Sequence, residues 1–214
     1  MKTNFSGIDK ILFVSVSFTL ALLVARLVYT HEVVYMFYPW NFFLALIPMA
    51  CSKRLGKLDK MNFNAICYLT IWLLFFPNAP YLVTDLFHFS EREGCPGWFD
   101  LILVSSASWN GIIIAAISLL QVEQFLRKSY NNKKVMLLLL FFIALCGYGV
   151  YLGRFPRFNS WDIITNPTGL AYFIKNSLIH PHEHISAWAF TSIFSLLFGI
   201  IFFTIKILYG ERRI

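Results

Sequence analysis

The stretch VMLLLLFFIALCGYGVY, residues 135–151, contains no charged side chain. A helix that crosses a bilayer needs about 20 mainly apolar residues, so this stretch approaches the length of a membrane span. Similar stretches lie elsewhere in the chain, at 11–29, 33–51, 63–81, 101–120 and 185–208. The sequence therefore predicts an all-α, polytopic bundle of six transmembrane helices, forming a single integral membrane domain over residues 1–214.

The composition of the whole chain points to the same class of protein. Hydrophobic residues make up 58% of the 214 residues and charged residues 14%, whereas a soluble domain carries roughly 25% charged and roughly 45–50% apolar residues. A soluble enzyme and a disordered chain are therefore excluded. The net charge of +7 comes from short basic clusters between apolar runs. Because no soluble basic face gathers them, we expect the lipid bilayer as partner and no nucleic acid.

The basic residues also predict the orientation of the spans. With the N-terminus inside, 13 of the 18 Lys and Arg side chains fall on inner segments. Cytoplasmic loops retain positive charge, so we expect both termini in the cytoplasm. Between the last two predicted spans, Asn159-Ser160 and Asn166-Pro167 are typical helix starts, so this segment is expected to form a short helical cap on the extracytoplasmic side.

A candidate reactive stripe follows the third predicted span. If the helix broken at PNAP (77–80) resumes as an α-helix, Tyr81, Asp85 and His88 stand at i, i+4 and i+7 on one face. One interpretation is proton transfer or metal ligation, with Asp85 or His88 as base and Tyr81 orienting it. The alternative interpretation is an interfacial helix whose polar face meets water and headgroups.

Two arginines at the outer boundary oppose the usual charge bias. Arg154 and Arg157 are expected either to pair with an acidic residue (Asp85, Asp100 or Asp162) or to hold a phosphate or carboxylate with their planar guanidinium groups. Asp100 also has a structural explanation, because a carboxylate near the N-terminus of a helix is stabilised by the unpaired N–H groups and the helix dipole. The candidate substrate-binding residues are Asn78, Asp100, Arg154, Arg157, Asn159 and Asp162.

Three strings of sequence carry a family resemblance. PNAPYLVTDLFH (77–88), WFD (98–100) and GRFPRFNSWD (153–162) resemble those of domain-of-unknown-function family 1361, a family of polytopic bacterial membrane proteins. The resemblance covers most of the chain. It implies a multi-pass protein of a bacterial cytoplasmic membrane and supplies neither an activity nor a site residue.

The cluster HPHEH (180–184) precedes the last predicted span. Three imidazoles and a carboxylate suggest a metal site, to which His88 and Asp85 could contribute. Alternatively, a helix starting at Pro181 would use His180 and Glu183 as its cap. The sequence leaves the metal and any cofactor open.

The depth of the ionisable residues separates three functions. They gather at the outer boundary, and no predicted span carries one at its centre. This favours a rim pocket that binds, and by acid–base chemistry could process, an anionic or lipid-linked small molecule. A small permease usually has polar residues at the midplane, where this chain offers only Asn110 and nearby serines. A non-catalytic assembly partner needs no pocket. Whether the protein is an enzyme stays open.

Overall fold

The computed structural model describes residues 5–90 and 94–211. The regular secondary structure of this part of the chain is helical, and it contains no β-strand. The α-helices are α1 (Phe5–Thr30), α2 (Tyr38–Gly56), α3 (Phe63–Phe75), α4 (Asn78–Tyr81), α5 (Gly97–Leu126), α6 (Asn132–Arg154), α7 (Asp162–Thr165), α8 (Pro167–Ile179) and α9 (Ile185–Glu211). A 3₁₀ helix, η1 (Leu82–His88), follows α4 directly.

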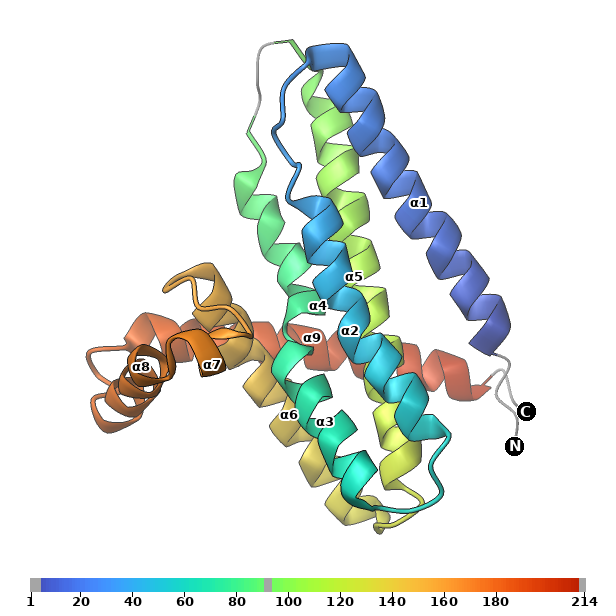
Figure 1. Cartoon of the computed structure of the whole chain (residues 1–214), viewed down its shortest axis with the longest axis vertical. Helices are drawn as coiled ribbons and strands as arrows, with labels where there is room; N and C mark the ends of the chain where they lie inside the picture. The colour runs from blue at the N-terminus through green and yellow to red at the C-terminus, as the bar shows by residue number, and fades with distance from the viewer. Residues whose placement is uncertain (1–4, 91–93, 212–214) are drawn as a thin grey trace.

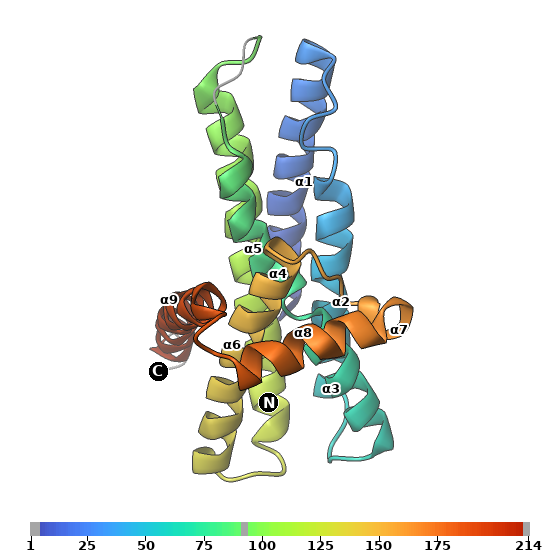
Figure 2. The same ribbon diagram turned by 90° about the vertical axis from the view of Figure 1, so that its left-hand side faces the viewer.

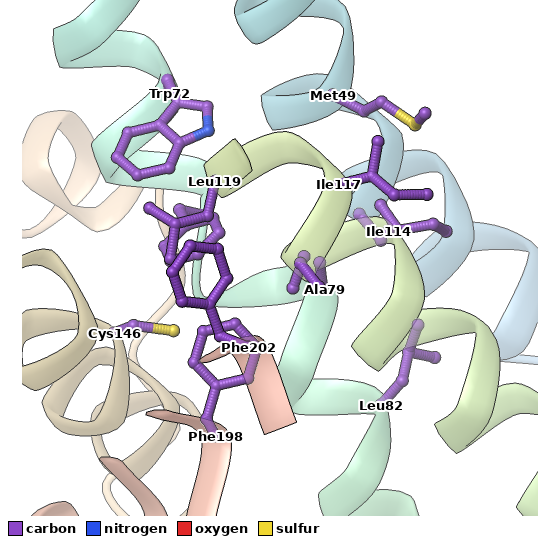
Figure 3. Close-up of a cluster of buried hydrophobic side chains, with 14 of the residues drawn as sticks. Met49, Trp72, Ala79, Leu82, Ile114, Ile117, Leu119, Cys146, Phe198 and Phe202 are labelled. Atoms are coloured by element: carbon purple, nitrogen blue, oxygen red, sulfur yellow. The ribbon is translucent and has the colours of Figure 1, made fainter. Parts of the chain in front are cut away.

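Helix α5 is the centre of the fold. It runs the length of the molecule (Figure 1) and packs against α1, α2, α4, η1 and α9. Its buried apolar residues meet Trp72 of α3 and Phe202 of α9 in the cluster shown in Figure 3. Trp72 is completely buried, and its indole N–H donates to Ser118 Oγ at 2.7 Å. The polar end of this large side chain is therefore satisfied inside the core.

Five helical segments are long and apolar enough to cross a membrane: Gly7–Thr30, Phe63–His88, Gly97–Leu126, Asn132–Arg154 and Ile185–Gly210. They indicate a multi-pass membrane protein in a lipid bilayer. The predicted span at 33–51 is not among the five, because its helix α2 starts only at Tyr38, with Pro39 in its first turn, and its last turn contains Lys53 and Arg54. Six spanning helices are therefore not confirmed.

The five segments are not aligned along one direction. Figures 1 and 2 show α9 running across α5 and α6 rather than alongside them. At the crossing with α6, Ser195 Oγ donates to the carbonyl of Ile143 at 3.2 Å. Gly147 makes this close approach possible, because a Cβ there would overlap Ser195 Oγ. A small residue at the contact lets the two backbones approach closely.

Polar side chains join α1 to α5. Asn110 Nδ2 donates to the carbonyl of Ser15 at 3.2 Å and to Thr19 Oγ1 at 3.0 Å, and Thr19 Oγ1 lies 3.0 Å from Ser106 Oγ. Ser106 and Asn110 of the fourth predicted span thus face α1, where interhelical hydrogen bonds account for them, whereas Ser105 is exposed.

Candidate functional site: a capped pocket

A pocket of about 550 Å³ lies between the long helices and the cap segment that contains α7 and α8. Helices α2, α3, α4 and α6 and the cap contribute its walls, and none of the lining side chains is charged. Its polar lining consists of Asn41, Thr70, Asn78, Tyr81, Tyr148, Asn159 and Ser160. The remaining lining is apolar or aromatic, with Trp40 and Phe158 among the aromatic groups. Volume and lining resemble those of small-molecule sites in proteins.

The proline break between α3 and α4 forms one end of this pocket. The prolines of PNAP (77–80) have no N–H to donate to the carbonyls of Leu73 and Phe76, and the Ala79 N–H donates to Phe76 rather than to Phe75, so the helical hydrogen-bond pattern is interrupted here. The carbonyl of Phe75 accepts from Asn78 Nδ2 at 2.9 Å, and that of Leu74 accepts from Ser160 Oγ at 2.9 Å. Asn78 Nδ2 also donates to Ser160 Oγ at 2.8 Å. The break therefore binds the cap to the helices.

The cap is attached at its other end through α8. The Tyr148 hydroxyl lies 2.7 Å from Ser177 Oγ, and Trp188 Nε1 donates to the carbonyl of Ser177 at 3.0 Å. Near α7, the rings of Trp161 and Trp40 are in edge contact, at 6.1 Å between centroids. Figure 2 shows α8 crossing in front of α6. The cap is thereby held as one wall of the pocket.

Three of the residues predicted from sequence line this pocket: Asn78, Tyr81 and Asn159. Both contacts of Asn78 use its Nδ2, so within the described residues its Oδ1 has no hydrogen-bond donor. Asn41 also lines the pocket, but sequence reasoning did not select it as a site residue. The signal that could have identified Asn41 is its amide side chain, the only strongly polar one in the apolar run 40–47.

The predicted stripe of Tyr81, Asp85 and His88 does not form, because residues after Tyr81 continue as a 3₁₀ helix rather than an α-helix. Three residues per turn place Asp85 and His88 on one side but move Tyr81 off it. Tyr81 lines the pocket, Asp85 is 1% exposed, and His88 is exposed. Asp85 Oδ2 accepts from Asn41 Nδ2 at 3.4 Å, which places the carboxylate next to the pocket lining.

The two outer arginines have different environments. Arg154 Nη1 lies 2.8 Å from His88 Nε2, and its guanidinium lies 5.2 Å from the centre of the Phe87 ring. Because a guanidinium only donates, His88 Nε2 is the acceptor. Arg157 is exposed, has a positive φ of 62°, and makes no hydrogen bond or ion pair with any residue that the structure describes. It immediately precedes Phe158, which lines the pocket, so its guanidinium is available to a ligand at the pocket margin.

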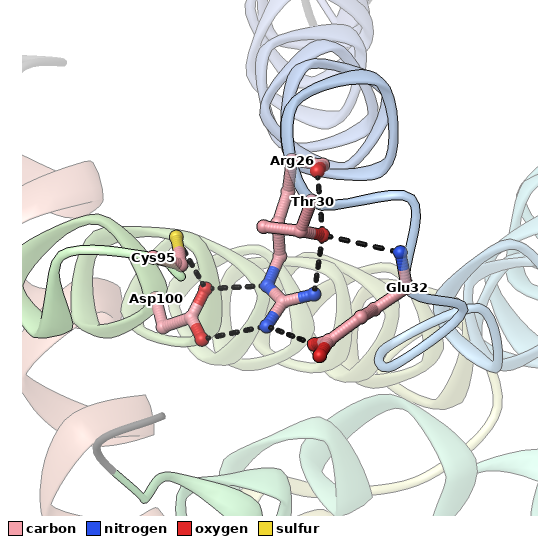
Figure 4. Close-up of polar contacts among 5 residues, drawn as sticks. All are labelled: Arg26, Thr30, Glu32, Cys95 and Asp100. Atoms are coloured by element: carbon pink, nitrogen blue, oxygen red, sulfur yellow. Dashed lines mark hydrogen bonds and ion pairs between the residues drawn. The ribbon is translucent and has the colours of Figure 1, made fainter. Parts of the chain in front are cut away.

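Asp100 pairs with Arg26, a partner that the sequence did not predict. Arg26 Nε donates to Asp100 Oδ1 at 2.7 Å and Nη2 to Oδ2 at 3.2 Å, and both residues are 2% exposed (Figure 4). Glu32 and Thr30 complete the surroundings of the guanidinium, and the Cys95 thiol donates to Asp100 Oδ1 at 3.6 Å. This pair joins α1 to α5, and Asp100 does not line the pocket.

Asp162 is the first residue of the short helix α7. Its Oδ2 accepts from the Asn159 backbone N–H at 2.7 Å and its Oδ1 from Thr165 Oγ1 at 2.7 Å. These hydrogen bonds hold the pKa of Asp162 below its ordinary value, with the backbone bond from Asn159 as the larger cause. Asp162 thus orders the loop that delivers Asn159 to the pocket.

The histidine cluster does not start a helix at Pro181. Residues 180–184 form a turn, in which the Glu183 N–H donates to the carbonyl of His180, and α9 begins at Ile185. His184 Nε2 lies 3.0 Å from Asn176 Nδ2. No three His, Cys, Asp or Glu side chains among the described residues are grouped so that they could hold a metal ion.

Comparison with known proteins gives one match. A family model described as "Protein of unknown function (DUF1361)" matches residues 40–205. No curated protein matches the chain, and no solved structure matches it.

Proposed function

Because the chain belongs to the DUF1361 family, whose description names no activity, we propose its function from the geometry of the capped pocket. The protein binds a lipid-linked small molecule, with the apolar chain inside the pocket and an anionic group at its margin. The observation that supports this most is a pocket of about 550 Å³ with an apolar wall and only uncharged polar groups, built into a membrane protein.

The lining matches a lipid better than a free anion. Apolar side chains such as Leu73, Leu145 and Ile174 suit a hydrocarbon chain, whose burial releases roughly 25 cal/mol per Å² of apolar surface. A small anion without such a chain would find no charged side chain in the lining. Arg157 supplies the cation outside the lining, where a phosphate or carboxylate of the bound molecule would meet its guanidinium.

Binding is the function that the geometry favours over catalysis. Asp85 and His88 lie outside the lining, and Arg154 already contacts His88. Acid–base chemistry on a bound molecule would need these groups to move into the pocket. Permease activity has less support, since Asn110 donates to α1 rather than to a central pathway.

The proposal places the pocket at the extracytoplasmic rim of a bacterial cytoplasmic membrane. Its basis is the charge bias, with both termini and the basic segments at 53–60 and 127–134 in the cytoplasm. This orientation needs an even number of crossings, which α2 completes as the sixth. A cysteine introduced at Lys57 should resist a membrane-impermeant maleimide in intact cells, and rapid labelling there would overturn the orientation.

The test of binding compares two tryptophan substitutions on α8. Ile174→Trp fills the pocket, whereas Leu178→Trp, on the same helix at a position that is 61% exposed and outside the lining, is the matched control. The probes are fluorescent dioleoylglycerol and dioleoyl phosphatidic acid, added to protein in phosphatidylcholine nanodiscs. We expect Ile174→Trp to weaken binding of both probes about tenfold or more and Leu178→Trp to leave it unchanged.

Arg157→Gln separates the headgroup from the chain. The variant should lose affinity for phosphatidic acid by about tenfold, since a charge-assisted hydrogen bond contributes about 1.5–3 kcal/mol, and should bind dioleoylglycerol as the wild type does. If Ile174→Trp binds each probe as tightly as the wild type does, the pocket is not the lipid site.

A further inference from the structure

Asn41 connects the pocket to a buried carboxylate. It lies on α2, lines the pocket, and donates from Nδ2 to Asp85 Oδ2 at 3.4 Å. Asp85 belongs to η1 and is 1% exposed, whereas Asn41 is half-buried. The pocket therefore has one lining amide whose far side meets an acidic group.

The chemistry of a carboxylate constrains the orientation of this amide. An ionised carboxylate only accepts hydrogen bonds, so Asn41 must turn its NH₂ group toward Asp85. Its carbonyl oxygen, Oδ1, lies in the same amide plane, on the opposite side of the Cβ–Cγ bond, and so points away from Asp85. Within the described part of the chain, this oxygen accepts no hydrogen bond. An acceptor without a donor at a pocket wall favours a ligand that brings a donor.

Other titratable and charged groups surround Asp85. From α2, the Tyr38 side chain is completely buried, and its hydroxyl hydrogen-bonds to no residue that the structure describes. From α6, Arg154 is the cation in electrostatic range, while His88 of η1 contacts that arginine. From α5, Asp100 is already paired with Arg26. None of these groups lines the pocket, so Asn41 is the link from Asp85 to a bound molecule.

We propose that Asp85 is a positioning residue, which fixes Asn41 with its carbonyl oxygen toward the pocket and thereby selects lipids that carry a hydrogen-bond donor, such as a free hydroxyl group. This inference rests on the proposed function of the pocket. It adds the class of headgroup that the pocket prefers and the residue that sets the preference.

Protonation of Asp85 should reverse the arrangement. A protonated carboxyl group can donate to Asn41 Oδ1, and the amide would then turn its NH₂ group toward the pocket. The preference for a hydroxyl donor should therefore weaken as the pH falls, and this change should depend on Asp85. His88→Gln is the control, because His88 is the neighbouring imidazole that contacts Arg154 and glutamine keeps an acceptor for that arginine.

The experiment compares dioleoylglycerol with its O-methyl ether, which keeps the chains but lacks the donor. Wild-type protein in phosphatidylcholine nanodiscs should bind the free alcohol about three- to tenfold more tightly, as expected for one neutral hydrogen bond. Asp85→Asn and Asn41→Leu should each reduce this ratio toward one. The double variant should show no further loss beyond Asn41→Leu, because Asp85 acts through Asn41.

The outcomes separate the two proposals. If wild type binds both lipids equally while Ile174→Trp still abolishes binding, the pocket is a lipid site and the selection by Asp85 is wrong. A ratio that survives in Asp85→Asn, or that changes equally with pH in Asp85→Asn and wild type, also overturns the role of Asp85. If neither lipid binds to the wild type, the proposed function itself fails.

Discussion

Replacing Arg26 by methionine removes the only cation next to Asp100 among the described residues, at a contact where both partners are 2% exposed. The two hydrogen bonds, at 2.7 and 3.2 Å, form a bidentate pair, and methionine keeps most of the volume without the charge. Asp100 is then left as a buried carboxylate without its counterion.

The expected cost follows from this burial. Breaking a buried ion pair by removing one partner costs about 3–5 kcal/mol, because an uncompensated charge remains inside. Replacing both partners by neutral side chains of similar size, as in Arg26→Met with Asp100→Leu, should restore most of that loss. Lys53→Met is the matched control: its pair with Asp9 is 2.8 Å long but about 40% exposed, and such pairs contribute about 0–1 kcal/mol.

Cys95 provides the assay, because its thiol is buried beside Asp100 and burial raises its pKa. The protein should therefore react slowly with maleimide at Cys95 in detergent. If Arg26→Met makes local opening about 3–5 kcal/mol easier, the labelling rate should rise by about two to four orders of magnitude. Lys53→Met should leave the rate within a few-fold of wild type.

The double variant Arg26→Met with Asp100→Leu tests whether the buried charge of Asp100 causes the loss. In this double variant, Cys95 should react at close to the wild-type rate. If it reacts as fast as in Arg26→Met alone, the loss in the single variant does not come from the uncompensated charge of Asp100. A rate unchanged from wild type in Arg26→Met would show that the pair does not stabilise the junction between α1 and α5.

Three further predictions concern stability. Gly111→Ala should lower the free energy of unfolding by about 1–3 kcal/mol in thermal denaturation, because a Cβ there would overlap the carbonyl of Ala79, whereas Gly210→Ala, with nothing within 4 Å, should not. Glu123→Gln should cost about 2–4 kcal/mol, since this carboxylate, only 4% exposed, accepts from Arg127 at the end of its own helix and from Lys206 of α9. Because the pKa of Asp162 is lowered, its hydrogen bonds to the Asn159 amide and Thr165 should stabilise the loop fully above the ordinary aspartate pKa of 3.8. This stabilisation should be lost as the pH falls below that value, measured as faster hydrogen exchange at the Asn159 amide.

Long apolar stretches predicted the helices well, because their length and lack of charge depend only on local sequence. The family resemblance carried by residues 77–88 and 153–162 was confirmed by the family match over 40–205. The predicted span at 33–51 fitted less well, since Pro39 marks a later helix start than hydropathy alone indicates. The direction of α9 relative to α5 depends on packing at residues such as Gly147, which no local pattern reveals.

The candidate site was predicted only in part, for a similar reason. Tyr81 and Asp85 were placed on one helical face under α-helical geometry, which the 3₁₀ helix after the proline break replaces. The partner of Asp100 is Arg26, 74 positions away, and pairing between distant helices cannot be inferred from spacing. Asn41 enters the pocket only because α2 packs beside the break, so its neighbours were unknown before the fold.

Lipid in the pocket is the central claim, and photocrosslinking tests it most directly. Dioleoylglycerol with a diazirine at the end of an acyl chain would be irradiated with wild-type protein in nanodiscs, and the adducts located by peptide mass spectrometry. The account predicts adducts on the pocket-lining residues Leu73, Leu145 and Ile174, which an excess of unlabelled lipid removes. Adducts confined to outward residues such as Ile11 and Ile193, 71% and 70% exposed, would contradict it.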